Sequence, residues 1–122
     1  MKNKVLIIED DPASLMLIED LLQAKNYDVL STAFPNKALE EIHNFIPDII
    51  ITDINLPQMS GFELQKQVKN IPKFKQTPII ALTAIAIQKE NKDSLKDDFS
   101  YHLTKPLCIK TLLSTLQNFL NK

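Results

Sequence analysis

The sequence of 122 residues contains no arginine, so all 14 of its positively charged side chains are lysines. Because only arginine offers a planar, bidentate guanidinium group, any phosphate held by this chain must be bound by lysine, backbone N–H groups or a metal ion. The net charge is −1, which provides no electrostatic footprint for nucleic acid or for an anionic membrane. We therefore expect neither a nucleic acid nor a membrane among its binding partners.

Glycine and cysteine occur only once each. Gly61 alone cannot provide a glycine-rich nucleotide-binding loop such as GxGxxG. Cys108 has no second cysteine with which to form a disulfide, and its helix-like context predicts a packing role. Residues 1–4 lead into only four apolar residues, so no signal peptide is visible, and no apolar run approaches the roughly 18 residues that span a bilayer. The sequence predicts a reduced, cytoplasmic, soluble protein with a single domain over residues 1–122.

Five short apolar runs alternate with longer stretches of helical periodicity. The predicted strands are residues 5–8, 29–32, 49–52, 79–82 and 101–104. Several of them lack polar alternation, which is typical of parallel strands buried on both faces. Helices are predicted from Pro12, with Asp11 as the N-cap, from near Pro35, and over residues 61–68, 88–99 and 109–120. This alternation predicts an α/β fold, a five-stranded parallel sheet in a doubly wound, flavodoxin-like (βα)5 sandwich.

The last two predicted helices differ in how firmly they should pack. Residues 88–99 are mostly charged and amide-rich, with Leu95 as the main apolar anchor, so this helix should be the least firmly packed. The helix over residues 109–120 carries a long apolar stripe. The stripe consists of Ile109, Leu112, Leu113, Leu116, Phe119 and Leu120.

Chemically active side chains follow four of the five predicted strands. In doubly wound sheets, ligands bind beyond the carboxyl ends of the strands. Each side chain alone has an ordinary explanation, since an acid after a strand often caps a helix and a single lysine is usually solvated. Together they indicate a site, and its clustered carboxylates would repel one another without a cation such as Mg²⁺. These residues are Glu9, Asp10 and Asp11 after the first strand, Asp53 after the third, Thr83 after the fourth and Lys105 after the fifth.

The sequences around these positions resemble those of response-regulator receiver domains. The matching segments are VLIIEDD, TDINLPQMSGFEL, PIIALTA and HLTKPL, and the resemblance extends over about residues 4–121. The spacing agrees too, because Asp10 lies 43 positions before Asp53 and Thr83 lies 22 positions before Lys105. Each segment alone is a weak signal, whereas their combination is highly specific.

The resemblance implies a phosphorylation site. It identifies Asp53 as the phosphoacceptor and Asp10 as a direct Mg²⁺ ligand. Glu9 would bind the ion through water, and the backbone carbonyl of Asn55 would complete the protein ligands. An aspartate suits this role because a carboxylate accepts a phosphoryl group to form a reactive acyl phosphate.

The resemblance also implies a response to phosphorylation. Lys105 would pair with the phosphoryl group, and the peptide bond before Pro106 would be cis. The Thr83 hydroxyl would turn toward the phosphoryl oxygen, coupled to a switch side chain three residues before the lysine. That side chain is His102, where the family usually has Tyr or Phe.

Other positions also depart from the family pattern. Asp98 and Phe99 stand where the family often has Gly-Ala, which predicts a local cost or a redrawn loop. Ile85 replaces a residue that is often polar, so it should restrict the approach of hydrolytic water. His43 has only a predicted surface role.

The leading hypothesis is a phosphorylation-switched signalling module that is not an enzyme, although it promotes its own phosphotransfer and dephosphorylation. The donor would be a sensor histidine kinase or a His phosphotransfer protein. A downstream protein would bind the face formed by the fourth helix, fifth strand and fifth helix, and the chain would be a monomer or weak dimer. Whether the domain stands alone or belongs to a longer chain is left open.

Two other functions remain as alternatives. The first is an Asp-nucleophile phosphatase resembling the haloacid dehalogenases, although Asn55 stands where those enzymes carry a second acid. The second is a degenerate receiver that binds partners without phosphorylation, although all acceptor and ligand residues are present.

Overall fold

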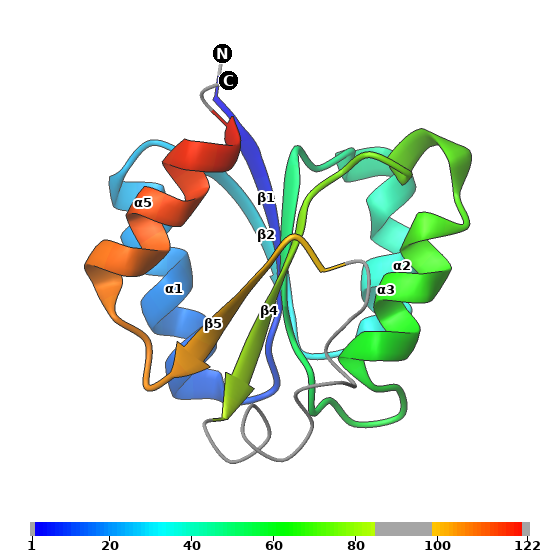
Figure 1. The fold of residues 1–122 in the computed structure, drawn as a ribbon, viewed down its shortest axis with the longest axis horizontal. Helices are drawn as coiled ribbons and strands as arrows, with labels where there is room; N and C mark the ends of the chain where they lie inside the picture. Colours follow the sequence, from blue (N-terminus) through cyan, green and yellow to red (C-terminus); the bar gives the residue numbers. More distant parts are fainter. Residues whose placement is uncertain (1, 85–98, 121–122) are drawn as a thin grey trace.

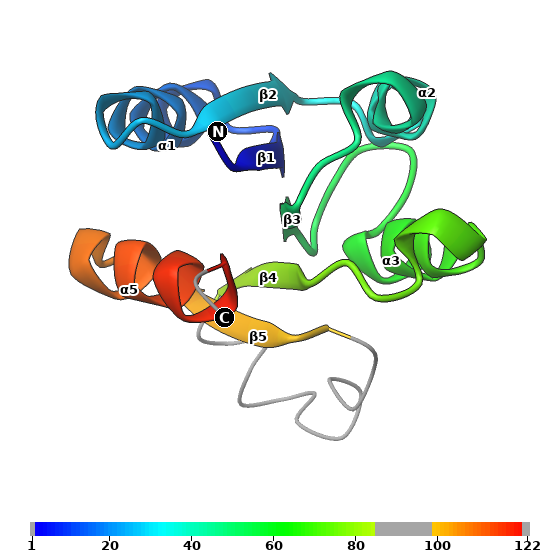
Figure 2. The ribbon, with the colours of Figure 1, turned by 90° about the horizontal axis from the view of Figure 1, so that it is seen from above.

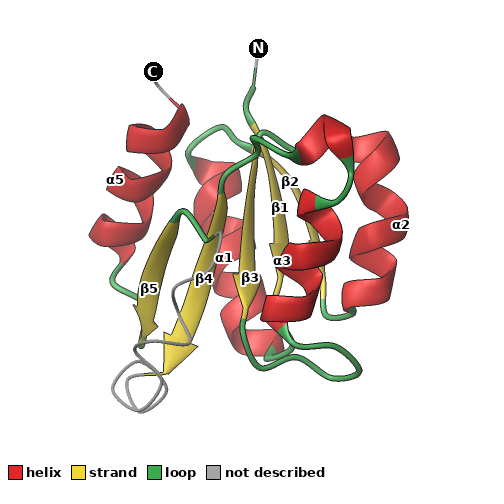
Figure 3. Cartoon of the chain, turned by 45° about the vertical axis from the view of Figure 1, so that its right-hand side comes forward, coloured by secondary structure: helices red, strands yellow, loops and turns green. Residues whose placement is uncertain are grey.

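A computed structural model describes residues 2–84 and 99–120 of the chain. Five parallel strands form one sheet (Figure 1), and Figure 3 shows their order, β2-β1-β3-β4-β5. Because every strand runs in the same direction, their carboxyl ends share one edge, the lower edge in Figure 3. The strands are β1 (Lys4–Ile8), β2 (Asp28–Thr32), β3 (Ile49–Asp53), β4 (Ile79–Ala84) and β5 (Tyr101–Lys105).

Helices cover both faces of the sheet, as Figure 2 shows. The helices α1 (Pro12–Ala24) and α5 (Ile109–Leu120) lie on one face. The helices α2 (Pro35–Phe45) and α3 (Gly61–Lys69) lie on the other, and a 3₁₀ helix, η1 (Pro72–Phe74), follows α3. The predicted doubly wound parallel sheet is therefore confirmed. The predicted helix at 88–99 lies outside the described residues except for Phe99, and no described helix is long and apolar enough to cross a membrane.

Strand alternation divides the core into two clusters. Val5 and Ile7 of β1 pack on the α1/α5 face, whereas Leu6 and Ile8 pack on the α2/α3 face. All four side chains are at most 1% exposed. Because both faces of β1 are buried, its sequence is continuously apolar and does not alternate between polar and apolar residues. The central strands therefore hold the carboxyl edge of the sheet in a fixed position.

Side-chain caps start two helices next to that edge. Asp11 caps α1 as predicted, since its carboxylate accepts hydrogen bonds from the Ser14 backbone N–H at 3.1 Å and from the Ser14 hydroxyl at 2.7 Å. Ser60 caps α3 by accepting from the backbone N–H of Glu63 at 3.2 Å. Ser60 was not predicted as a cap, although Ser-x-x-Glu before an apolar run is a capping-box pattern.

Two predictions about the start of α5 were wrong. Cys108 is exposed and precedes the helix, so it does not pack in the core. Ile109 is 44% exposed although it continues the apolar stripe by periodicity. The physical reason is that the buried part of α5 begins one turn later, at Leu112, so the first turn extends past the edge of the core.

The end of α2 contains a strained residue. Ile46 has φ 52° and ψ 70°, the left-handed conformation, which is unfavourable for a β-branched side chain. It is 40% exposed, so it contributes little to the core. Ile46→Asn should therefore raise the free energy of unfolding by about 1 kcal/mol, measured by urea denaturation. Ile46→Val keeps the β-branch and should show no gain, and a loss of stability in the Asn variant would contradict the prediction.

Candidate functional site

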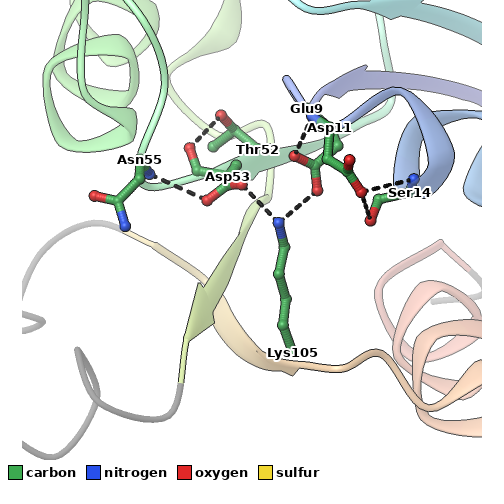
Figure 4. Close-up of polar contacts among 7 residues, drawn as sticks. All are labelled: Glu9, Asp11, Ser14, Thr52, Asp53, Asn55 and Lys105. Atoms are coloured by element: carbon green, nitrogen blue, oxygen red, sulfur yellow. Dashed lines mark hydrogen bonds and ion pairs between the residues drawn. The ribbon is translucent and has the colours of Figure 1, made fainter.

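Lys105 contacts two carboxylates at the carboxyl ends of other strands. Its Nζ lies 2.6 Å from Oε1 of Glu9 and 2.7 Å from Oδ2 of Asp53 (Figure 4). Burial would lower the pKa of Lys105, but its hydrogen bonds to Asp53 and Glu9 outweigh that effect, so the pKa is raised. Lys105 is thus a firmly charged ammonium at the carboxyl edge of the sheet.

Glu9 is fully buried directly after β1. Its Oε2 accepts a hydrogen bond from the backbone N–H of Asp11 at 3.1 Å. Burial raises the pKa of Glu9, and the hydrogen bond from Lys105 opposes this shift. Backbone and lysine together therefore hold this carboxylate in a single orientation.

Asp53 ends the buried strand β3 and is 7% exposed. Its Oδ1 accepts a hydrogen bond from the backbone N–H of Asn55 at 3.1 Å, while its Oδ2 faces Lys105. The hydroxyl of Thr52 donates to the Asp53 carbonyl at 3.0 Å. Both carboxylate oxygens are thus oriented by named donors, and the backbone behind them is held in place.

Gly61 allows α3 to approach the backbone of the strand end closely. A Cβ at this position would lie 2.5 Å from the Asp53 carbonyl oxygen and 2.8 Å from Cα of Ile54. The N–H of Gly61 donates to the Ile54 carbonyl at 2.7 Å, which fixes this approach. The only glycine of the sequence therefore serves the strand end that carries Asp53, a role that its sequence context had not predicted.

Gly61→Ala should destabilise the protein by about 1–3 kcal/mol, because backbone atoms must move to admit the methyl group. At other helix positions a change from glycine to alanine usually stabilises the protein. A loss of stability in this variant would therefore indicate the close backbone approach at Gly61. Thermal and urea unfolding measure it, with Lys66→Ala, at an exposed position of α3, as a near-neutral control. An alanine variant as stable as the wild type would show that the close approach is not required.

Three carboxylates converge at the same edge. Glu9, Asp10 and Asp53 each offer an oxygen, and these oxygens lie within 4.8 Å of one another. Lys105 supplies one positive charge against three negative ones, so the cluster keeps an excess of negative charge. A small hard cation with oxygen ligands fits this donor set, and Mg²⁺ suits a site with few protein ligands because it retains water. The residues present therefore fit the predicted ion.

The fourth and fifth strands bring Thr83 and Lys105 to the same edge. Thr83 pairs with Thr104 in the β4–β5 register, one position before Lys105. Thr83 is 1% exposed, and within residues 2–84 and 99–120 its Oγ1 has no hydrogen-bond partner. The peptide bond between Lys105 and Pro106 is cis, as the sequence resemblance implies.

His102 lies on β5, away from the carboxylates. It is half-buried, and its ring meets the edge of Phe99 at a centroid distance of 5.6 Å. Phe99 is only 8% exposed and fills the core where the family often has a small residue. Ile85 and Asp98 lie outside the described residues. His43 is exposed, as predicted, although its ring lies 6.3 Å from that of Phe74.

A family model described as the response regulator receiver domain matches residues 5–117. The chain belongs to this family. Among curated relatives, the receiver domain is 29% identical over 120 residues to the polar-differentiation response regulator DivK of Brucella ovis, which covers 98% of both chains.

Solved structures agree with this membership. The receiver domain matches the chemotaxis response regulator CheY4 of Vibrio cholerae with a TM-score of 0.89 and 32% identity, covering 98% of this chain and 100% of that one. It also matches the receiver domain of the sensor histidine kinase PA1611 from Pseudomonas aeruginosa PAO1, with a TM-score of 0.90, 27% identity and full coverage of both chains. That structure has a magnesium ion coordinated in its active-site cleft.

Proposed function

We propose that this receiver domain accepts a phosphoryl group on Asp53 and uses it to switch its binding to a protein partner. The observation that carries the proposal is the position of Asp53, whose oriented carboxylate lies at the rim of the sheet beside Lys105 and two further acids. Membership of the receiver family supports a phosphoacceptor role.

The transfer step needs positioning and charge neutralisation more than covalent chemistry. A carboxylate oxygen of Asp53 forms a bond to phosphorus while the phosphorus–nitrogen bond of a phosphohistidine breaks. The electron pair of that bond stays on the imidazole of the donor, which leaves as a neutral ring because its other nitrogen carries a proton, and Asp53 becomes an acyl phosphate. Lys105, now paired with two carboxylates, is placed to pair with an oxygen of the incoming phosphoryl group.

A magnesium ion would be held by Asp10, Asp53 and the backbone carbonyl of Asn55, with Glu9 acting through water. When bound, it supplies charge neutralisation for the transferred phosphoryl group. The acidic cluster and the magnesium ion in the cleft of the PA1611 receiver support this assignment. The domain promotes its own phosphotransfer and dephosphorylation without acting as an enzyme on other substrates.

The switch would begin at Thr83. Its buried hydroxyl has no hydrogen-bond partner among the described residues, and a phosphoryl oxygen on Asp53 would provide one. As Thr83 turns, the His102 ring moves inward. A downstream protein then reads the change on the face formed by β5, α5 and the helix predicted over residues 88–99.

The names of the relatives support a place in two-component signalling. DivK and CheY4 are named as response regulators, and PA1611 is a sensor histidine kinase that carries its own receiver. These names support a sensor histidine kinase or a His phosphotransfer protein as the donor. The domain, residues 1–122, acts in the cytoplasm as a monomer or weak dimer, with no nucleic acid as a partner.

Incubation with acetyl phosphate and MgCl₂, followed by intact-mass spectrometry, tests the proposal. A single added phosphoryl group that persists long enough to be measured is the expected result. Steady consumption of acetyl phosphate without a modified protein would instead favour a phosphatase. An unchanged mass together with unconsumed acetyl phosphate would favour a degenerate receiver.

A further inference from the structure

Gln65 is a polar side chain in a position that otherwise suits an apolar one. It lies on the buried side of α3 and is only 2% exposed. Its Nε2 is buried and has no hydrogen-bond partner among the residues that the structure describes. By contrast, the amide of Gln67 on the same helix donates to Glu63 at 3.1 Å. A buried, unpaired donor is unfavourable, so Gln65 would gain stability from an acceptor brought within its reach.

A row of packed rings leads from α3 to β5. Phe62 lies on α3 one turn before Gln65, at the i,i+3 spacing that makes helix residues neighbours. Its ring packs against Phe99 at a centroid distance of 5.7 Å, and Phe99 meets the ring of His102 at 5.6 Å. The rings therefore connect the helix that carries Gln65 with the strand that carries His102.

Strand alternation places His102 and Thr83 on the α3 face of the sheet. Leu103 and Leu82 belong to the cluster under α1 and α5, so the residues next to them on β5 and β4 point to the opposite face. Ala81, directly paired with His102 in the β4–β5 register, belongs to the α2/α3 cluster. Movement of Thr83 therefore vacates space on the side of the sheet where Gln65 is buried.

We propose that Gln65 is a positioning residue for the switch, and that its side-chain N–H donates a hydrogen bond to a ring nitrogen of His102 when the ring turns inward. The inference rests on the proposed function, since it needs phosphorylation to move Thr83. A phenylalanine at position 102 would fill the same space but offer no acceptor. A histidine offers one, and the new bond pairs the buried donor of Gln65, which favours the inward state. The polar residues at 65 and 102 therefore compensate each other.

The side-chain amide of Gln65 is a direct spectroscopic reporter of this bond. Its ¹H–¹⁵N signals should shift when beryllofluoride and MgCl₂ are added to the wild-type protein. In His102→Phe the signals should stay in place, while the backbone amides near Asp53 still respond. Gln65 signals that do not move in the wild type, or that move equally in His102→Phe, would overturn the inference.

A double-mutant cycle tests the energetic coupling. Gln65→Met keeps the approximate shape of the side chain and removes the donor, so beryllofluoride affinity should fall about threefold to tenfold. In the His102→Phe background the same change should have no further effect, whereas effects that multiply in full would contradict the inference. Gln67→Met serves as the matched control and should leave the affinity unchanged.

Stability separates switching from a purely structural role. Because the donor is unpaired in this conformation, Gln65→Met should raise the melting temperature of the unphosphorylated protein by roughly 3 °C or more. A lower melting temperature would show that the amide is already satisfied, which overturns the inference. A wild-type protein that takes neither beryllofluoride nor a phosphoryl group overturns the proposed function together with this inference. A wild type that responds with an unmoved Gln65 overturns the inference alone.

Discussion

Asp53→Asn should abolish phosphoryl incorporation from acetyl phosphate. An amide at this position has no anionic oxygen to attack phosphorus, and the shape of the side chain is otherwise preserved. The surrounding donors remain, since the N–H of Asn55 and the ammonium of Lys105 still find acceptors in the amide oxygen and Glu9. Intact-mass spectrometry after incubation with acetyl phosphate and MgCl₂ measures the incorporation. No phosphorylated Asp53→Asn protein should be detected.

The matched control for this experiment is Asp20→Asn. Asp20 is exposed on α1, so its replacement should leave incorporation at the wild-type level. Unfolding curves of both variants show whether the fold is intact. If Asp53→Asn still gains a hydrolysable phosphoryl group under the same conditions, another residue is the acceptor.

Asp10→Asn should weaken Mg²⁺ binding far more than Asp11→Asn does. Asp10 offers an oxygen to the acidic cluster, whereas the Asp11 carboxylate is engaged with Ser14 at the start of α1. Loss of an outer-shell partner lowers metal affinity by about 10- to 100-fold, and loss of a direct ligand should cost at least as much. Titration with MgCl₂, followed by NMR of the backbone amides around Asp53, measures both variants.

The neighbouring position makes Asp11→Asn a close control. It removes one negative charge beside the site and keeps a side-chain oxygen that can still cap α1. A small loss of Mg²⁺ affinity from the charge alone is therefore expected. Equal losses for the two variants would refute the division between a metal ligand and a helix cap.

The sequence was sufficient to predict the fold class. Continuous apolar runs at residues 49–52 and 79–82 predicted strands buried on both faces, and the structure has them as β3 and β4. Pro12 after Asp11 predicted the start of α1 to the residue. These predictions succeeded because strand burial and helix capping depend on the local order of residue types.

The edge of the core was harder to predict. Ile109 continues an apolar stripe by periodicity, yet it is 44% exposed, because periodicity shows which side of a helix is apolar and not where its neighbours end. Cys108 was assigned to a packed helix for the same reason, and it is exposed. Only the assembled sheet determines how far the core extends along α5.

The site at the carboxyl edge of the sheet was also only partly predictable from the sequence. By itself, the sequence determined that acids, a threonine and a lysine lie at the carboxyl ends of four strands. It also implied that they meet, since parallel strands with helical crossovers bring their carboxyl ends to one rim. Only the tertiary structure decided that Lys105 bridges Glu9 and Asp53, and that Gly61 lets α3 approach the strand end. It also decided that the amide of Gln65 is buried without a partner among the described residues. Contacts of this kind join residues far apart in the chain, and their geometry depends on the packing of elements that local sequence patterns do not encode.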